Sequence, residues 1–518
     1  MKVPTTHPGV AELVGAFLQA APEDSAAAYR QLVGAVWDAG ALTPAAQDAV
    51  PVIAAVLPKA APEHLGHLLV LLGLLAEAEY PALDGPVASA VREHLDFFLG
   101  LVPGARDGEP LTLALVYLLS HFPADRDRIL EAVLDIGLSP DDLSRLDRAL
   151  TVLEPGERPD LGRVWPSPSA WTLNADELAF DASWINALTS EQITANWEND
   201  TRTVLGYTGA KAYWAMCNGA PENTPTATVQ GRTGNGADAG RVDAAHLFTP
   251  HLAALRCPAC EADLRAGEGG VTCAGCGVSY PVAGGILDLT ERAADDAGGH
   301  ADFLEKLSQV PSMGLFYEAV ARPAFLRLCG QNWGGDITLD GEDGYLARNI
   351  HPVDGPVLDL AAGAGRWTEV IAEIVGAERL VALDMGLPML TALRSRLPEV
   401  PSVLASASDL PFDDASLGAV VCWNALQAFY SHAAAAIAEV GRCLKPGGTF
   451  TLLTFRRSDD PVYAYFAHAH RFPQHSGGLE LFDLEELKGW LAGAGLTIRE
   501  ESGPGTFVFI TAVREETR

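Results

Sequence analysis

The chain has 518 residues, a length that excludes a single small module and corresponds to roughly three or four domains. Hydrophobic residues make up 48% of it and charged residues 20%, so it can bury cores and is not mainly disordered. Acidic residues number 67 against 35 lysines and arginines, and the formal net charge is −32. Because this charge repels phosphate backbones, we do not expect a general nucleic-acid binder.

The sequence contains no targeting or membrane-spanning signal. Its first residues, MKVPTTHPGV, lack the apolar segment of a signal peptide, and no run of about 18 uncharged apolar residues occurs. We therefore expect a cytoplasmic protein that does not span a membrane.

Residues 1–150 are predicted to form an α-helical domain. They are rich in Ala and Leu, and apolar residues recur at helical spacing, for example in Val50–Leu57 and Leu111–Leu118. Ser139 followed by Pro140 predicts a helix start that the serine caps. Helices alternating with short breaks in this way resemble stacked repeats of the HEAT type.

Residues 151–245 contain half of the ten tryptophans of the chain. These are Trp165, Trp171, Trp184, Trp197 and Trp214. Large aromatics at this density indicate a packed core, with the lining of a ligand pocket as the alternative. The polar stretch Pro221–Ala237 is typical of a linker or a loop.

Four of the eight cysteines form two Cys-x-x-Cys pairs within residues 250–295. They are Cys257, Cys260, Cys273 and Cys276. Because each pair can present both thiolates on one side of a tight turn, the spacing predicts a zinc ribbon with a structural Zn²⁺. No coordination position is left open, so we expect the metal to stabilise this module without catalysing, and its loss not to abolish cofactor binding. Redox-active pairs are the alternative.

Residues 300–518 are predicted to form an α/β domain. A buried strand, Val357–Leu360, leads through a Gly/Ala turn into a helix at Arg366–Val375, and a second strand, Arg379–Leu383, ends at Asp384. This spacing lets a turn approach a nucleotide-like ligand while the carboxylate takes both ribose hydroxyls. Since GxGxxG is missing, an adenosine ligand fits better than a dinucleotide.

Further motifs follow in order. A third strand ends with Asp409, a fourth strand is predicted at Leu417–Cys422, and a helix at 432–443 leads to a strand at Thr449–Phe455. The runs VLDLAAGAG, ALDMGLPML, ASDLPFDDASLGAVVCWNAL and CLKPGGTFTLLTF resemble, in order and spacing, class I S-adenosylmethionine-dependent methyltransferases of the ubiquinone/menaquinone methyltransferase-like superfamily. The resemblance covers about residues 310–515 and implies a doubly wound, Rossmann-like domain.

The resemblance implies a site for the methionine end of S-adenosyl-L-methionine. Asp359 is expected to orient the amino group, with Gly363 and Gly365 under it. Asn424 is expected near the methionine end. The ribbon followed by such a domain is also similar to a bacterial and plastid group of ribbon-bearing methyltransferases, in which residues 316–330, including Tyr317, are expected to lie over the cofactor as a lid.

The same resemblance implies a site for the adenosine end. Asp384 is expected to bind the ribose diol and Met385 to pack on adenine. Asp409 is expected to accept a hydrogen bond from the adenine amino group, and Leu410 to donate its backbone amide. Ser408 completes the predicted set.

Two residues depart from the family pattern. Ala361 stands in the cofactor turn where a glycine is usual, which is tolerable if its φ stays below zero. The run Asn424-Ala-Leu-Gln427 lacks the histidine that follows the asparagine in many relatives, which puts a histidine base there in doubt.

Methyl transfer needs a nucleophile held in line with the methyl group, and a base only where the nucleophile keeps its proton until attack. The stretch Val462–His475 lies where this superfamily inserts its substrate cap. We predict Tyr463 and His468 as catalytic residues, with a structural or solvated role as the alternative.

The predicted function is methyl transfer to a small-molecule or natural-product acceptor, free or bound to a peptide or carrier. An RNA methyltransferase is the first alternative, and a non-catalytic cofactor-binding scaffold the second. Residues 301–518 carry 17 basic and 28 acidic residues, which disfavours RNA, and the three acidic cofactor residues are intact, which disfavours the scaffold. Residues 1–245 are predicted to help recognise the substrate or its carrier, with a homodimer contact or a solubilising role as the alternative.

Overall fold

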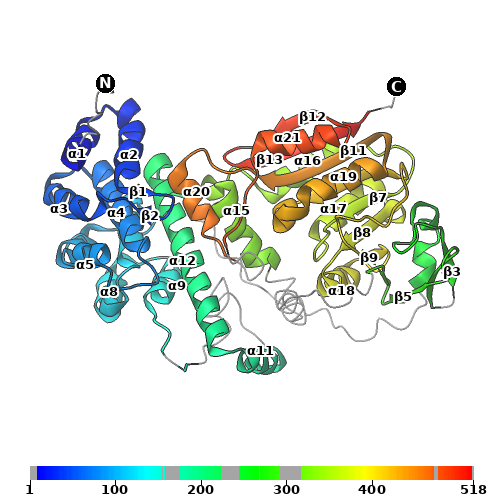
Figure 1. Cartoon of the computed structure of the whole chain (residues 1–518), viewed down its shortest axis with the longest axis horizontal. Coiled ribbons are helices and arrows are strands. Elements are labelled where there is room, and N and C mark those ends of the chain that lie inside the picture. Colours follow the sequence, from blue (N-terminus) through cyan, green and yellow to red (C-terminus); the bar gives the residue numbers. More distant parts are fainter. Residues whose placement is uncertain are drawn as a thin grey trace, which may run out of the picture. The chain divides into compact units, whose positions relative to one another are not determined.

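The computed structural model describes residues 9–154, 156–157, 175–222, 244–267, 269–290, 317–471 and 477–515. Trp165, Trp171 and most of Pro221–Ala237 lie outside these ranges. The chain forms two compact units, and Figure 1 labels many of their elements. The first unit is Met1–Thr172, Leu178–Thr226 and Ser458–Leu479, and the second is Leu173–Glu177, Ala227–Arg457 and Glu480–Arg518. Residues 458–479, which fall inside the predicted α/β range, therefore belong to the helical unit.

The first unit is almost entirely helical, which confirms the prediction of a helical N-terminal region; the likeness to HEAT-type repeats remains a prediction. Its helices are α1 (Val10–Gln19), α2 (Pro22–Val36), α3 (Ala46–Val56), α4 (Pro62–Glu77), α5 (Pro86–Arg92), α6 (Leu95–Leu99), α7 (Pro110–Leu119), α8 (Arg126–Val133), α9 (Pro140–Leu150), most of α11 (Ala175–Ala187), α12 (Ser190–Asn218) and α20 (Pro461–His468). A two-stranded hairpin, β1 (Trp37–Asp38) and β2 (Ala41–Leu42), follows α2.

Local sequence explains where several of these helices begin. Proline occupies the first position of α2, α4, α5, α7, α9 and α20, where its missing N–H leaves no hydrogen bond unmade. At α9 the side chain of Ser139 accepts a hydrogen bond from the amide of Asp142, as predicted. Helices α4 and α7 are buried along almost their whole length and form the centre of the unit, against which α12 packs.

The second unit is built on one sheet of eleven strands in the order β12-β13-β11-β10-β7-β8-β9-β6-β5-β4-β3. The strands are β3 (Leu264–Gly267), β4 (Gly270–Cys273), β5 (Ser279–Ala283), β6 (Ile286–Asp288), β7 (Val357–Leu360), β8 (Leu380–Asp384), β9 (Ser402–Leu404), β10 (Leu417–Trp423), β11 (Leu444–Phe455), β12 (Leu496–Ser502) and β13 (Phe507–Arg514). The six strands from β6 to β11 in this order run parallel, and β13 and β12 add an antiparallel edge. The predicted doubly wound α/β fold is confirmed.

The helices of this unit connect or cover the strands (Figure 1). They are α15 (Arg322–Gly330), α16 (Leu339–Asn349), α17 (Arg366–Val375), α18 (Leu387–Arg396), α19 (Ala433–Cys443) and α21 (Leu484–Gly493), with a short π-helical turn, η7 (Tyr317–Ala321), before α15. Among the described helices, none combines the length and apolar character needed to cross a bilayer.

The cysteine module, which lies within residues 250–295, shares one hydrophobic core with the α/β domain. Cys257 and Leu287 of the module are buried in the same cluster as Val381 of β8 and Phe450 of β11. Strand β6 of the module also pairs in parallel with β9. The module is thus a continuation of the large sheet.

Candidate functional site

Asp359 lies near the carboxyl end of β7 and is 1% exposed. The hydroxyl of Thr368, from α17, donates to its carboxylate at 2.6 Å. Burial raises the pKa of Asp359 to about 7, against the effect of the Thr368 hydrogen bond. This carboxyl group therefore changes its charge near neutral pH.

Asp384 ends the neighbouring strand β8 and ties two turns together. One carboxylate oxygen accepts from the amide of Gly363 at 2.8 Å, and the other from the amide of Gly386 at 2.7 Å. Burial raises the pKa of Asp384, and both amides act against this rise. The structure thus brings the predicted glycine turn and the predicted ribose carboxylate into direct contact.

The glycine turn requires left-handed backbone at three positions. Gly363 has φ 56° and Gly365 φ 92°, values that glycine adopts without strain. A Cβ atom on Gly365 would lie 2.8 Å from Cγ of Leu393. Ala361 has φ 59°, so the condition under which an alanine is tolerable here, a φ below zero, is not met. The chain holds this alanine in a strained conformation at the entrance of the turn.

Tyr317 and Asn424 meet where the charge of Asp384 reaches Tyr317. The side-chain amide of Asn424 donates to the Tyr317 hydroxyl at 3.4 Å. Burial raises the pKa of Tyr317, and the negative charge of Asp384 contributes to the rise. The Tyr317 ring is therefore close enough to Asp384 to feel its charge. Asn424 itself has φ 57°.

Sequence reasoning gave Gln427 no role in this arrangement. Its side chain is 2% exposed, and its Nε2 donates to the carbonyl of Asn424 at 2.8 Å. Its Oε1 accepts from the hydroxyl of Thr454 at 2.9 Å. Gln427 therefore holds the left-handed backbone of Asn424 in place. The only sequence signal was that this run lacks the usual histidine.

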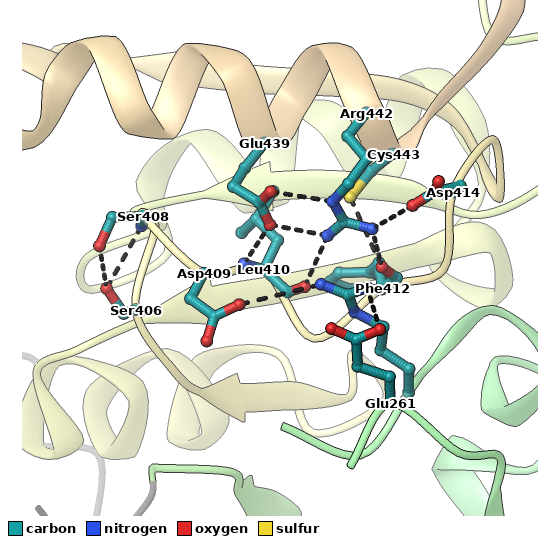
Figure 2. A network of polar contacts seen from close by, with 11 residues as sticks. Glu261, Ser406, Ser408, Asp409, Leu410, Phe412, Asp414, Glu439, Arg442 and Cys443 are labelled. Carbon is teal, nitrogen blue, oxygen red and sulfur yellow. Dashed lines mark hydrogen bonds and ion pairs between the residues drawn. The ribbon is translucent and has the colours of Figure 1, made fainter. Parts of the chain in front are cut away.

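The adenosine end differs from the expectation at Leu410 and Asp409. The Leu410 amide donates to Glu439 at 2.9 Å and is therefore not available to adenine in this structure (Figure 2). The side chain of Asp409 is 68% exposed and lies 3.9 Å from the guanidinium of Arg256. Met385, by contrast, is 68% exposed next to Asp384, where a ligand can reach it.

The residues that directly follow β9 lie closer to Asp384 in the sheet. The amide of Ala405 donates to the carbonyl of Asp384 at 3.2 Å. Ser406 comes next, and its hydroxyl lies 2.9 Å from that of Ser408, whose amide it also accepts at 3.2 Å (Figure 2). Ser408 is thus engaged in a local turn. The sequence gives no sign that β9 ends at Leu404, so the turn at Ser406–Ser408 could not be predicted.

The predicted catalytic residues Tyr463 and His468 lie in α20 and belong to the first unit, whereas the cofactor candidates belong to the second. Tyr463 is 3% exposed, and Nδ1 of His468 lies 3.1 Å from the carbonyl oxygen of Leu479. Their neighbour Tyr465 donates to the buried carboxylate of Glu77 at 2.8 Å. The structure gives these side chains packing and hydrogen bonding within the helical unit. His475 lies outside the described residues.

The four predicted metal ligands come together. The sulfur atoms of Cys257, Cys260, Cys273 and Cys276 all lie within 4.8 Å of one another. The amides of Gly275 and Cys276 point at the sulfur of Cys273, at 3.3 and 3.4 Å. Hydrogen bonds from these backbone amides lower the pKa of Cys273 to about 6, which favours the thiolate that a metal needs. Four sulfur donors at this spacing fit a tetrahedral metal ion.

Comparison with known families identifies the central part of the second unit. Residues 357–448 match the family model described as a methyltransferase domain. This range contains Asp359, the glycine turn, Asp384 and Asn424. Residues 357–448 form a methyltransferase domain.

Curated relatives match part of the chain. The chain is 39% identical over 103 residues to an uncharacterised methyltransferase of Mycobacterium bovis, covering 20% of this chain and 41% of that protein. It is 35% identical over 126 residues to a trans-aconitate 2-methyltransferase of an Acidovorax species, covering 23% and 45%. It is 35% identical over 119 residues to a ubiquinone/menaquinone biosynthesis C-methyltransferase of Burkholderia mallei, covering 22% and 48%. The chain thus spans less than half of the length of these relatives.

Solved structures of methyltransferases also match part of the chain. One is the geranyl diphosphate C-methyltransferase of Streptomyces coelicolor in complex with Mg²⁺, geranyl diphosphate and S-adenosyl-L-homocysteine. It is 16% identical, covers 34% of this chain and 79% of its own, and has a TM-score of 0.29.

Proposed function

We propose that the protein transfers a methyl group from S-adenosyl-L-methionine to a small-molecule acceptor. The observation that carries the proposal is the methyltransferase domain in which Asp359 and Asp384 stand at the carboxyl ends of β7 and β8, on either side of the Gly363 turn. In parallel α/β sheets ligands bind outside these strand ends.

The residues around the turn fit this cofactor. Asp384 keeps lone pairs for the ribose hydroxyls after accepting from Gly363 and Gly386. Asp359, once charged, can hold the amino group, and the exposed Met385 can cover adenine. When bound, the cofactor supplies a methyl group on a positively charged sulfur, so the chain has only to hold the acceptor in line and exclude water.

A small-molecule acceptor is supported by charge and by relatives. Residues 301–518 carry 17 basic and 28 acidic residues, which opposes RNA binding, the alternative substrate class. Two curated relatives are named for methylation of trans-aconitate and for quinone biosynthesis.

We further propose that the helical unit contributes to recognition of the acceptor. Supporting this, the stretch Val462–His475, where the resemblance places the substrate cap, falls within residues 458–479 of that unit. A homodimer contact is the alternative role for this unit.

We also propose that the four cysteines hold a structural Zn²⁺. The proposal rests on four sulfur atoms within 4.8 Å, a donor set that fills a tetrahedral site and leaves no open position. Metal analysis of protein purified under reducing conditions without chelator is expected to give about one zinc per chain, and its absence would contradict the proposal.

Calorimetric titration with S-adenosyl-L-homocysteine tests the proposed cofactor. Replacing Asp384 by Ala removes the acceptor of two backbone amides and of the ribose hydroxyls, and we expect a loss on the order of 1–3 kcal/mol of binding free energy. Asp354→Ala, at an exposed position before β7, is the control and is expected to bind normally. Equal affinity in wild type and Asp384→Ala would contradict the assignment.

A further inference from the structure

The cysteine module is bonded to residues 402–413 of the methyltransferase domain at two places. The first is the sheet itself, where β6 runs parallel to β9 with Leu287 opposite Val403. The amide of Ser402 donates to Gly285 at 3.3 Å, and the amide of Leu289 to Leu404 at 3.0 Å. The beginning of the 402–413 segment is therefore held by β6.

The second place is the short stretch that leads into the first metal ligand, Cys257. The amide of Arg256 donates to the carbonyl of Pro411 at 3.1 Å, and the amide of Asp413 donates to Ala254 at 2.9 Å. The guanidinium of Arg256 lies 3.8 Å from Glu261, within the module, and 3.9 Å from Asp409. The end of the segment is thus fastened to the residue that precedes a cysteine ligand.

Helix α19 holds the same segment from another side (Figure 2). Glu439 accepts the Leu410 amide at 2.9 Å, and Arg442 donates to the carbonyl groups of Leu410 and Phe412 at 3.0 and 2.7 Å. Arg442 is itself held by Glu439 and Asp414. Residues 402–413 are thus hydrogen-bonded to the cysteine module, to α19 and to the neighbouring strand β8.

The segment matters because it borders the cofactor site. The amide of Ala405 donates to the carbonyl of Asp384, the residue proposed to bind the ribose. A displacement of β9 or of the loop after it therefore shifts residues that lie next to Asp384. Module, segment and Asp384 form one continuous hydrogen-bonded path.

We propose that the cysteine module is a positioning element for the cofactor site, and that loss of its metal loosens residues 402–413 and weakens cofactor binding. This rests on the proposed function and on the proposed Zn²⁺. Without a metal ion, the Cys257–Cys260 and Cys273–Cys276 turns are connected by contacts among their sulfur atoms, by the contact of Cys257 with Tyr280 and by the pairing of β3 with β4. A bound metal ion would add direct bonds to all four sulfur atoms. The first turn begins at Cys257, directly after Arg256, whose amide is bonded to Pro411. Greater motion of this turn would therefore also loosen the loop at Pro411–Asp413.

The test compares the full-length Cys276→Ser variant with Cys217→Ser, which removes a cysteine of the helical unit outside the metal cluster. Zinc content, affinity for S-adenosyl-L-homocysteine and hydrogen exchange are measured for both. In Cys276→Ser we expect loss of zinc and faster hydrogen exchange at the amides of Leu289 and Asp413. We also expect the affinity for S-adenosyl-L-homocysteine to weaken about tenfold, a typical coupling between two binding sites. Exchange at the paired strands β11 and β13 is expected to stay slow, and Cys217→Ser to match wild type.

Wild-type protein stripped of metal by a chelator and then resupplied with Zn²⁺ provides the same comparison if Cys276→Ser does not fold. Affinity and exchange are expected to change on stripping and to recover with zinc. Unchanged exchange at residues 402–413 after metal loss overturns the inference, as does a loss of protection that extends equally to β11 and β13. If metal-loaded wild type does not bind S-adenosyl-L-homocysteine, the proposed function fails, while the exchange measurement still decides whether the metal holds the segment.

Discussion

Ala361 combines a side chain with a backbone conformation that favours glycine, at φ 59°. Left-handed backbone costs an L-residue roughly 1–2 kcal/mol of folding free energy. The greater flexibility of glycine in the unfolded chain costs less, roughly 0.5–1 kcal/mol relative to alanine. We therefore expect Ala361→Gly to raise the free energy of unfolding slightly, by up to about 1 kcal/mol. Urea-induced unfolding of the full chain measures this.

Ala362 is the matched control, since it loses the same methyl group but does not have positive φ. Ala362→Gly is expected to lower the free energy of unfolding by about 1 kcal/mol. Equal losses in both variants would mean that Ala361 is not strained.

The Asp359 carboxyl group couples the site to pH. Its pKa is raised to about 7 by burial, whereas an exposed aspartate in the unfolded chain titrates near pH 4. Between these values the folded protein binds more protons than the unfolded one, so the contribution of Asp359 to stability is present below about pH 4 and is lost as the pH rises toward 7.

Cofactor binding should show the opposite trend, because the charged carboxylate attracts an amino group. Between pH 6 and pH 7.5 we expect the affinity for S-adenosyl-L-homocysteine to strengthen by about fivefold to tenfold, following ionisation of Asp359. Asp359→Asn should bind more weakly and lose this dependence. A wild-type affinity that does not vary over this range would argue against contact between Asp359 and the amino group.

Residue-level prediction from the sequence worked where a side chain follows a buried strand directly. Asp359 and Asp384 are placed by the strand–turn–helix spacing alone, and Gly363 contacts Asp384 as that spacing requires. Leu410 could not be placed in this way, because its amide partner Glu439 lies 29 residues further along the chain. The positive φ of Ala361 was also hidden, since an alanine gives no signal of left-handed backbone.

At the scale of elements, the central strands were predictable and the joins were not. Strands β7 and β10 were predicted to within one residue, because parallel strands buried on both faces are continuous apolar runs. β11 begins at Leu444, five residues before the predicted start, and includes the Pro-Gly-Gly turn residues. The pairing of β6 with β9 was not predictable, since a strand of three residues has no measurable period.

Helix α20 is anchored in the helical unit by a buried carboxylate. Glu77 is 1% exposed and accepts from Tyr465 at one oxygen and from Tyr117, at 2.6 Å, at the other. Tyr465→Phe removes the one donor that the described residues offer to the first oxygen, and we expect a loss of roughly 1.5–3 kcal/mol in the free energy of unfolding. Thermal and urea unfolding of the full chain measure the loss.

Tyr430→Phe serves as the control for this substitution. Tyr430 stacks on Phe482, and among the described contacts its hydroxyl makes no hydrogen bond. We expect Tyr430→Phe to lower the free energy of unfolding by less than about 0.5 kcal/mol. Similar losses in the two variants would show that the Glu77 hydrogen bond contributes little.

At the scale of the whole molecule, the helical unit cannot be removed by cutting the chain once. A fragment of residues 244–518 keeps α20, whose Val462 and Phe466 are fully buried, but lacks α12, against which this helix packs. We expect that fragment to aggregate, because it exposes large apolar side chains. Replacing residues 458–479 by a short Gly/Ser linker should restore solubility.

The linker is feasible because the ends of this insertion meet. The amide of Arg457 donates to the carbonyl of Phe482 at 2.8 Å, and the amide of Phe482 to Phe455 at 3.3 Å. Solubility and binding of S-adenosyl-L-homocysteine are compared for the two fragments. Two equally soluble fragments would indicate that α20 is stable without its helical partners.

The insertion also sets an order of events during synthesis. Tyr465 follows its partner Glu77 by 388 residues, so at roughly 5–20 residues per second a ribosome delivers the second partner roughly 20–80 s after the first. Through that interval the surfaces of α7 and α12 that receive Phe466 have no occupant. During that interval the helical unit of the nascent chain is open to chaperones, and it becomes complete only once α20 has been synthesised.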